Sequence, residues 1–293
     1  MAMPKDIGII DLMLAIPGSD NSHFYEWIKP MLMDRESHDV FKMPAQYMFK
    51  DIPDSPDTDD YISYTLMQMD KHNISRAMLG VGRHAGIQEE AVKKYPDRFF
   101  ACYEANPNFG MEEVRRIESL KVEYDIKAVT ASPAMISPPV PVNDKKWYPI
   151  YAKLVELDIP FCPCMGVPGP RVPFLPQKVE LLDEVLWFFP ELKIVTRHGC
   201  EPWTELACKL MLKYPNLHYM TSAFAPKHYP KDIIDFANRR GSDQIMYAGY
   251  FPMGLSLDRI FSEMPNVPFR DEIWSKFLRD NAIRVFKLDP NQS

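Results

Sequence analysis

The feature of this sequence that most constrains its fold is a repeated alternation of short apolar segments with charged, amphipathic ones. Eight segments rich in β-branched and aromatic residues recur along the 293 residues, and stretches with apolar residues at helical spacing lie between them. The predicted strands cover residues 7–14, 74–82, 99–105, 126–132, 159–166, 193–199, 217–223 and 244–250. Strands that alternate with helices are typical of a parallel sheet with crossover helices.

The regular spacing of these elements favours a closed barrel over an open sheet. Helices are predicted over residues 87–95, 112–124, 176–189 and 201–214, with a final helix near 270–286. The chain has only 12 glycines and no Gly-rich phosphate loop, which argues against a dinucleotide-binding open sheet. We therefore predict an α/β fold, a (β/α)8 TIM barrel that forms a single domain over residues 1–293 with a long insertion after the first strand.

The predicted insertion covers residues 15–60, far more than the usual two to six residues of such a loop. It is rich in aromatic and methionine residues, which could cover the C-terminal ends of the strands as an apolar lid. The alternative is a subunit interface, because clustered aromatic and methionine side chains also mark association surfaces. The residues concerned are Phe24, Tyr25, Trp27, Met31, Phe41, Met43, Tyr47, Met48 and Phe49.

Charge and cysteine content indicate which partners and which compartment to expect. The net charge is −6 and no Lys/Arg block is present, so nucleic acid is not an expected partner. The apolar N-terminal run is interrupted by Pro17, Gly18 and Asp20, so we expect neither a signal peptide nor a membrane partner. Five cysteines, an odd number, indicate free thiols in a reducing compartment. We predict a cytoplasmic protein that forms a homodimer or higher homo-oligomer.

Several longer stretches carry a resemblance to a known family. They cover residues 69–79, 93–107, 147–161, 198–230, 246–252 and 280–288. In these stretches the chain resembles the amidohydrolase-related family, in the branch that includes aminocarboxymuconate semialdehyde decarboxylase and related aromatic-acid decarboxylases. The resemblance covers nearly the whole chain and implies a TIM barrel with an active site at the C-terminal ends of its strands.

The resemblance also implies a divalent metal site, but most ligand positions differ in this sequence. Members of the family carry Asp-x-His-x-His on the first strand, where this chain has Asp11, Met13 and Ala15. Cys164 replaces the histidine of the fifth strand, and Tyr250 replaces the aspartate of the eighth. Of the histidines only His198 remains, so we predict no metal cofactor. An unorthodox metal site built from Cys164, His198 and Glu104 is the alternative.

Four residues are the predicted catalytic groups. His198 can act as a general acid or base because imidazole titrates near neutral pH. Cys164 could be a nucleophile activated by His198, or a small buried apolar side chain. Tyr250 could donate a hydrogen bond to a developing oxyanion, or fill the space of the missing metal. Glu104, near the end of the third strand, is a candidate for acid/base chemistry, with a structural role as the alternative.

Six further residues are predicted to contact the substrate. Two arginines could bind a substrate carboxylate through their fork of donors, although each could equally be a solvated loop charge. The predicted set is Arg83, His84, Arg171, Met13, Trp27 and Asp11. Arg197, one residue before His198, is expected to face the helices in a structural ion pair, because alternate residues of a strand face opposite sides.

These features predict an amidohydrolase-like hydrolase that works without a metal on an apolar or aromatic carboxylated or acyl compound. His198 would be its acid/base group. The first alternative is a non-oxidative decarboxylase of an aromatic-type acid, in which a protonated His198 quenches the carbanion. The second is a non-catalytic relative that binds a small ligand in the old pocket, because fold alone does not determine activity.

Overall fold

The computed structural model describes residues 3–21, 25–39, 43, 45–83 and 86–290. Eight parallel strands form one sheet in sequence order, and they cover β1 Ile9–Asp11, β2 Ile74–Val81, β3 Phe99–Glu104, β4 Ala128–Ala131, β5 Phe161–Pro163, β6 Ile194–Thr196, β7 Leu217–Met220 and β8 Ile245–Met246. Each strand lies within a segment predicted from the sequence. The predicted (β/α)8 TIM barrel is confirmed.

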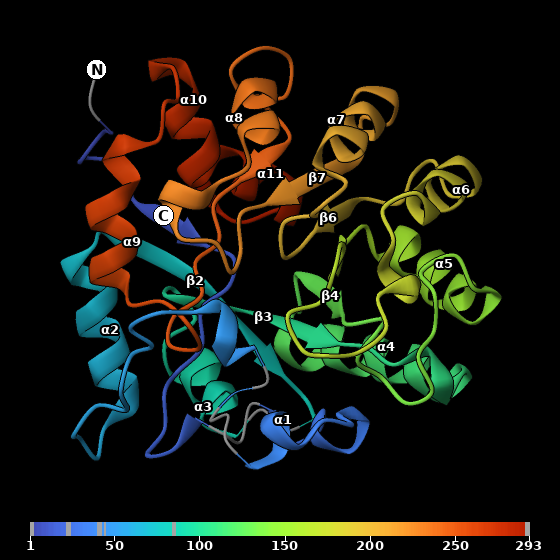
Figure 1. Ribbon diagram of the computed structural model, residues 1–293, viewed down its shortest axis with the longest axis horizontal. Coiled ribbons are helices and arrows are strands. Elements are labelled where there is room, and N and C mark those ends of the chain that lie inside the picture. Colours follow the sequence, from blue (N-terminus) through green and yellow to red (C-terminus); the bar gives the residue numbers. More distant parts are fainter. Residues whose placement is uncertain (1–2, 22–24, 40–42, 44, 84–85, 291–293) are drawn as a thin grey trace.

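The helices lie around the outside of these strands, as Figure 1 shows. They cover α1 Arg35–Asp39, α2 Tyr61–Lys71, α3 Ile87–Lys94, α4 Met111–Tyr124, α5 Tyr148–Leu157, α6 Leu181–Phe188, α7 Thr204–Lys213, α8 Lys231–Ala237, α9 Leu257–Glu263, α10 Asp271–Ser275 and α11 Asn281–Phe286. A π-helical stretch, η9 Lys276–Asp280, joins α10 to α11. No helix in the described part of the chain is both long enough and apolar enough to cross a membrane.

The barrel closes between its first and last strands. Leu14 forms an isolated parallel bridge with Phe251, and the Ala15 N–H donates to the Phe251 carbonyl at 2.9 Å. Both contacts lie just beyond the ends of β1 and β8. The strands are shorter than predicted, partly because β5 is flanked by Pro160 and ends at Pro163, and proline has no N–H for the ladder.

The interior of the barrel is filled by alternate residues of the strands, because a strand places every second side chain on the same face. Its cluster includes Ile10, Leu12, Met78, Phe100, Cys102, Ala128, Cys162, Val195, Met220, Met246 and Ala248. Ala282, Val285 and Phe286 of α11 belong to the same cluster. The C-terminal helix therefore closes the N-terminal end of the barrel, which leaves the opposite end for a site.

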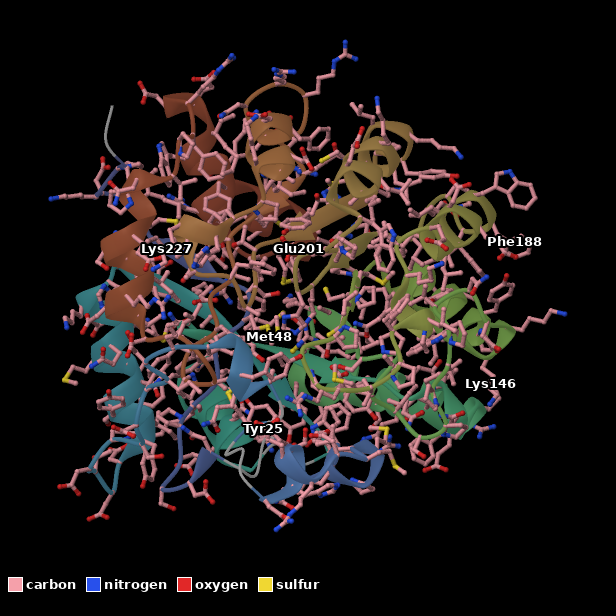
Figure 2. All side chains as sticks on the ribbon, in the orientation of Figure 1. Tyr25, Met48, Lys146, Phe188, Glu201 and Lys227 are labelled. Atoms are coloured by element: carbon pink, nitrogen blue, oxygen red, sulfur yellow. The ribbon has the colours of Figure 1, made fainter. Side chains whose placement is uncertain are left out.

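Residues of the 15–60 segment pack over the C-terminal ends of the strands. This segment contains two short 3-10 helices, η2 Lys29–Met31 and η3 Gln46–Met48, besides α1. Ile28 and Leu32 are buried in one cluster with Met135 and Cys164. Figure 2 shows Met48 near the middle of the view and Phe188, on α6, at the outer edge of the molecule. Phe24 and Phe41 lie outside the described residues.

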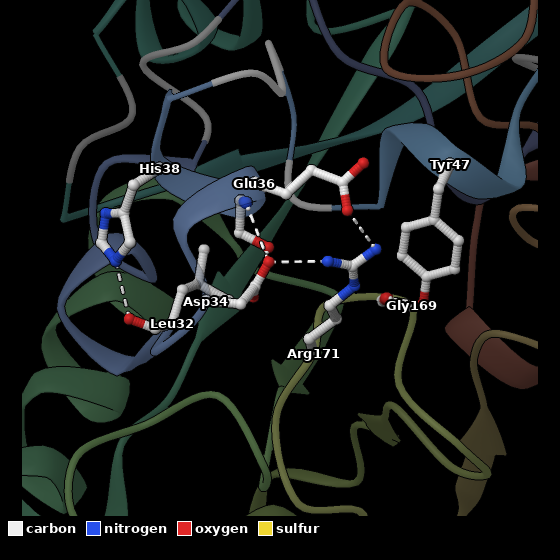
Figure 3. Close-up of polar contacts among 8 residues, drawn as sticks. Leu32, Asp34, Glu36, His38, Tyr47, Gly169 and Arg171 are labelled. Carbon is white, nitrogen blue, oxygen red and sulfur yellow. Dashed lines mark hydrogen bonds and ion pairs between the residues drawn. The ribbon is translucent and has the colours of Figure 1, made fainter.

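Polar contacts attach this segment to the loop after β5 (Figure 3). Arg171 donates to Asp34 at 2.6 Å and to Glu36 at 2.8 Å, and its guanidinium carbon lies 5.0 Å from the Tyr47 ring centroid. The Tyr47 hydroxyl donates to the Gly169 carbonyl at 2.6 Å. These contacts hold the insertion against the strand ends, while its predicted role as lid or subunit interface stays open.

Candidate functional site

A guanidinium lies at the centre of the C-terminal end of the barrel. Arg197, just after β6, donates from Nη1 to Glu104 Oε2 at 3.3 Å and approaches Met13 Sδ with Nη2 at 3.8 Å. The Thr130 hydroxyl donates to the same Glu104 oxygen at 2.5 Å. Burial disfavours the charged form of Arg197, but the Glu104 carboxylate favours it, and the pKa of Arg197 lies above its ordinary value. The group is therefore a permanent positive charge.

Arg197 differs from its predicted orientation, because it points into the barrel and not toward the helices. Val195 belongs to the interior cluster, so the alternation of β6 turns Arg197 to the same side. The prediction assumed that His198 points inward on a regular strand, in which case its neighbour Arg197 would point outward. The backbone leaves the extended conformation at His198, where φ is +62°. The alternation of inward and outward side chains therefore does not continue from Arg197 to His198.

His198 reaches the site through this left-handed backbone conformation. Gly199, with φ +87°, follows it, and a Cβ there would lie 2.3 Å from the Phe224 ring. The His198 N–H donates to the Ser222 hydroxyl at 2.9 Å, and Nδ1 lies 3.5 Å from the same oxygen. Burial, and then the charge of Arg197, lower the pKa of His198 to about 3. Its imidazole is therefore neutral at pH 7 in the site without substrate.

Aromatic rings form one wall beside His198. The Tyr250 ring meets the His198 ring edge-on, with centroids 5.7 Å apart, and stacks on Phe49 of the insertion at 5.4 Å. Burial raises the pKa of Tyr250 to about 12. Burial and the neighbouring Tyr250 raise the pKa of Tyr25 well above its ordinary value. Both phenols stay protonated at neutral pH and can donate hydrogen bonds.

Cys164 is placed among apolar side chains and not beside an activating base. It is 1% exposed, and its Sγ lies 3.6 Å from the Ser132 hydroxyl. Burial raises the pKa of its thiol above the ordinary value, so little thiolate is present at neutral pH. No contact between Cys164 and His198 is found in the described part of the chain. The geometry supports the small, buried apolar alternative for Cys164 over the nucleophile.

The predicted substrate contacts are not all brought together. Met13 lies beside Arg197, as described above. Arg83 donates to the buried carboxylate of Glu113 at 3.0 Å and lies over the Phe109 ring at 4.0 Å. Arg171 is held by the insertion, and Trp27 leaves 40% of its surface exposed. His84 lies outside the described residues.

Asp11 is buried where the first and last strands meet. It is 0% exposed, and its Oδ1 accepts from the Met13 N–H at 2.9 Å and the Gly249 N–H at 2.8 Å. Its Oδ2 accepts from the Tyr247 hydroxyl at 3.1 Å. A Cβ at position 249 would lie 2.7 Å from that oxygen, which explains the glycine there. The carboxylate joins β1 to the β8 region, which is a structural role, and its substrate contact stays a prediction.

Replacing Asp11 with asparagine is expected to change how stability depends on pH. Burial raises the pKa of Asp11 from 3.8 to about 6. An acid with a raised pKa stabilises the fold below its unfolded pKa, and this contribution, about 3 kcal/mol, is lost as the pH rises through about 6. Urea unfolding of Asp11→Asn between pH 4 and 7 should lack this decline, whereas the exposed-site variant Asp70→Asn should keep it. Parallel curves for wild type and Asp11→Asn would contradict the assignment.

The side chains at the implied metal positions do not fit a divalent ion. Met13 offers a thioether, Ala15 has no donor, and Cys164 and Tyr250 stay protonated at neutral pH. Such an ion prefers neutral imidazoles and ionised oxygens, and the guanidinium of Arg197 would repel it. Over the described ranges, no three His, Cys, Asp or Glu side chains gather where they could hold a metal, and this includes the alternative set of Cys164, His198 and Glu104.

Sequence reasoning undervalued or missed several residues of this site. Arg197 was assigned to the wrong face, and Thr130, Ser132 and Ser222 were not considered. The inward orientation of Arg197 could have been predicted from Val195, an apolar strand residue two positions earlier on the same face. The three hydroxyl groups gave no local signal, because Thr130 and Ser132 at the end of β4 and Ser222 after β7 reach the site only when the barrel forms.

Comparisons with solved structures agree with the fold. A TIM-barrel protein of uncharacterised function from Bordetella bronchiseptica has a TM-score of 0.72 and 20% identity, over 95% of this chain and 98% of that one. 2,6-Dihydroxybenzoate decarboxylase from Rhizobium has a TM-score of 0.66 and 16% identity, over 96% and 99%. 5-Carboxyvanillate decarboxylase from Novosphingobium aromaticivorans, solved with manganese and a nitrobenzoic acid, has a TM-score of 0.66 and 17% identity, over 97% of each chain.

The comparison with curated protein sequences finds no match. The amidohydrolase family profile, however, matches residues 42–288, most of the barrel. This match confirms the resemblance inferred from the sequence, and with the eight-stranded barrel it shows that the chain belongs to the amidohydrolase family of enzymes.

Proposed function

We propose that this protein is a non-oxidative decarboxylase of an aromatic or enolisable carboxylic acid, and that the guanidinium of Arg197 takes the electrostatic role of a divalent metal ion. The observation that carries the proposal is the position of Arg197, held inside the end of the barrel by Glu104 beside Met13, one of the implied ligand positions. The structures of aromatic-acid decarboxylases among the similar folds support the choice of reaction.

Loss of carbon dioxide leaves an electron pair on the carbon that carried the carboxylate. A hydroxyl or carbonyl oxygen conjugated to that carbon can accept the resulting charge. Arg197 could stabilise this oxygen through charge-assisted hydrogen bonds, which are stronger in a site that excludes water. Its interaction with Glu104 fixes the guanidinium before substrate arrives, so little reorganisation accompanies the reaction.

His198 is the proposed proton donor to the carbon. In the site without substrate, burial and Arg197 keep the imidazole neutral. A bound carboxylate places negative charge near both groups, which offsets the repulsion from Arg197 and raises the pKa of His198. Substrate binding would therefore bring a proton onto His198, and the imidazolium would deliver it to the carbon as carbon dioxide leaves.

The surroundings of the site favour an aromatic or other apolar body for the substrate. Met135, Ile28 and Leu32 pack in one buried cluster with Cys164, and Tyr250 and Phe49 form a stacked pair beside His198. Large apolar side chains with a few polar groups are typical of small-molecule sites. The hydrolase prediction finds less support, because Cys164 is a buried thiol without a neighbouring base and a metal-activated water has no fitting ligand set.

The proposal predicts carbon dioxide release and deuterium incorporation by chelator-treated protein. Suitable probes are carboxyl-labelled 2,6-dihydroxybenzoate and 5-carboxyvanillate, assayed in D2O with chelator and again with added manganese. Labelled carbon dioxide and a product with deuterium at the vacated carbon are expected without manganese. Turnover that requires manganese would contradict the role given to Arg197. Saturable binding of both probes without turnover would instead support the ligand-binding alternative.

A further inference from the structure

A cavity lies at the N-terminal end of the barrel, opposite the proposed active site. It has a volume of about 550 Å³ and lies between the starts of β2 and β3, the ends of α3 and α4, and the residues that follow α11. Arg76, Phe100, Lys93, Lys127 and Lys287 are among the residues that line it. Glu104 and Arg197 follow the other ends of their strands, so the two sites are separated by the length of the barrel.

The cavity contains a buried arginine whose donors are not all used. Arg76 is 4% exposed, and its Nε and Nη1 atoms have no hydrogen-bond partner among the described residues. Arg76 shares a face of β2 with Met78 of the interior cluster, and its guanidinium carbon lies 5.5 Å from the Phe100 ring centroid. Buried donors without partners are rare in folded proteins, and a buried charge without a partner is costly.

The charges around the cavity favour an anion as the missing partner. Four cationic side chains, Arg76, Lys93, Lys127 and Lys287, line it together with three acidic ones, Glu123, Asp125 and Asp289. Each of the three lysines already has a carboxylate partner: Lys127 pairs with Asp125 at 2.6 Å, Lys93 with Glu123 at 3.7 Å, and Lys287 with Asp158, which is not a lining residue. The missing partner is therefore that of Arg76. Burial lowers the pKa of Arg76, and the carboxylates of Asp289 and Asp97 offset part of this effect.

We propose that this cavity is a binding site for a small anion, in which one carboxylate or phosphate group pairs with Arg76. The planar guanidinium suits this role because its N–H groups match the oxygen geometry of both anions. The site is independent of the decarboxylase chemistry, because none of its lining residues belongs to the Arg197 site.

Inorganic phosphate and acetate are the probes for this site, with chloride at equal ionic strength as the reference. Thermal unfolding of the full chain in about 20 mM phosphate should show a midpoint roughly 3 °C higher than in chloride, if the affinity is in the millimolar range. Phosphate also stabilises proteins by general exclusion from their surfaces, so the informative quantity is the difference between wild type and variant. A shift in acetate as well as in phosphate would indicate a site that accepts carboxylates, and a shift in phosphate alone would indicate a site specific for phosphate.

Arg76→Met should lose the anion-specific part of the shift and should be no less stable than wild type in chloride, because it removes an unpaired buried charge. Arg76→Lys keeps the charge and serves if the methionine variant fails to fold. Calorimetric titration with phosphate should then show affinity at least about fivefold weaker, because lysine lacks the planar fork. Arg197→Met should keep the full shift. An equal shift in wild type and Arg76→Met, or equal affinity in Arg76→Lys, would overturn the proposal.

Discussion

Replacing Arg197 with methionine is expected to lower kcat/KM for decarboxylation of a substrate acid by about 1,000-fold. Removing one donor that stabilises a developing negative charge typically costs about 100- to 1,000-fold in rate. Here the lost group also carries the only permanent positive charge assigned to the reaction. Methionine has an unbranched side chain that suits a site lined by Met13 and Cys164, so a folded variant is expected.

Two matched variants separate the charge of Arg197 from its shape and from general effects. Arg197→Lys keeps the charge without the fork of donors, and it should recover at least about tenfold of the lost kcat/KM. Arg98→Met removes an arginine that pairs with Asp70 near the N-terminal ends of the strands, and its kcat/KM should stay within about threefold of wild type. Activity of Arg197→Met within tenfold of wild type would rule out the proposed role.

Replacing His198 with asparagine is expected to lower kcat by about 100- to 10,000-fold, the usual range for loss of a general acid. Asparagine is the suitable replacement because it tolerates positive φ better than most residues, and His198 has φ +62°. The backbone that holds Arg197 in place should therefore be retained. Tyr250→Phe is a useful companion, since it keeps the ring contacts with His198 and Phe49 but removes the hydroxyl.

The low pKa of His198 also leads us to expect proton uptake when a ligand binds. The pKa of His198 is about 3 in the empty site, so a carboxylate that raises it above 7 would bring close to one proton with it. Calorimetric titration of an unreactive aromatic acid, in buffers with different ionisation enthalpies, measures this number. About one proton is expected for wild type and none for His198→Asn. Binding without proton uptake in the wild type would show that His198 stays neutral and is not the donor.

His198 and Asp11 have opposite effects on stability as the pH falls. A histidine whose pKa is lowered on folding stabilises the fold above its ordinary pKa of 6.5, and this contribution is lost as the pH falls toward 3. Asp11, with its raised pKa, stabilises the fold as the pH falls from about 6 to 3.8. The two contributions partly cancel in the wild type, so each becomes visible only when its variant is compared with wild type.

Local sequence patterns were sufficient for the architecture but not for the orientation of every site residue. Alternating apolar residues and helical periodicity depend on neighbours close in the chain, so all eight strands and several of the surrounding helices could be located. Glu104 was identified as a carboxylate near a strand end, and His198 as the retained histidine. The direction of the Arg197 side chain was predicted wrongly because a single left-handed residue, His198, interrupts the alternation of the strand. This interruption cannot be recognised from the periodicity of the sequence.

The sequence by itself therefore determined the (β/α)8 barrel and its family. Only the tertiary structure decided that Arg197 lies inside the barrel with Glu104 and that Asp11 joins β1 to the β8 region. It also decided that Arg76 is buried, with two of its nitrogens lacking a hydrogen-bond partner among the described residues. The physical reason is that these properties depend on contacts between residues up to 238 positions apart, which form only when the barrel closes.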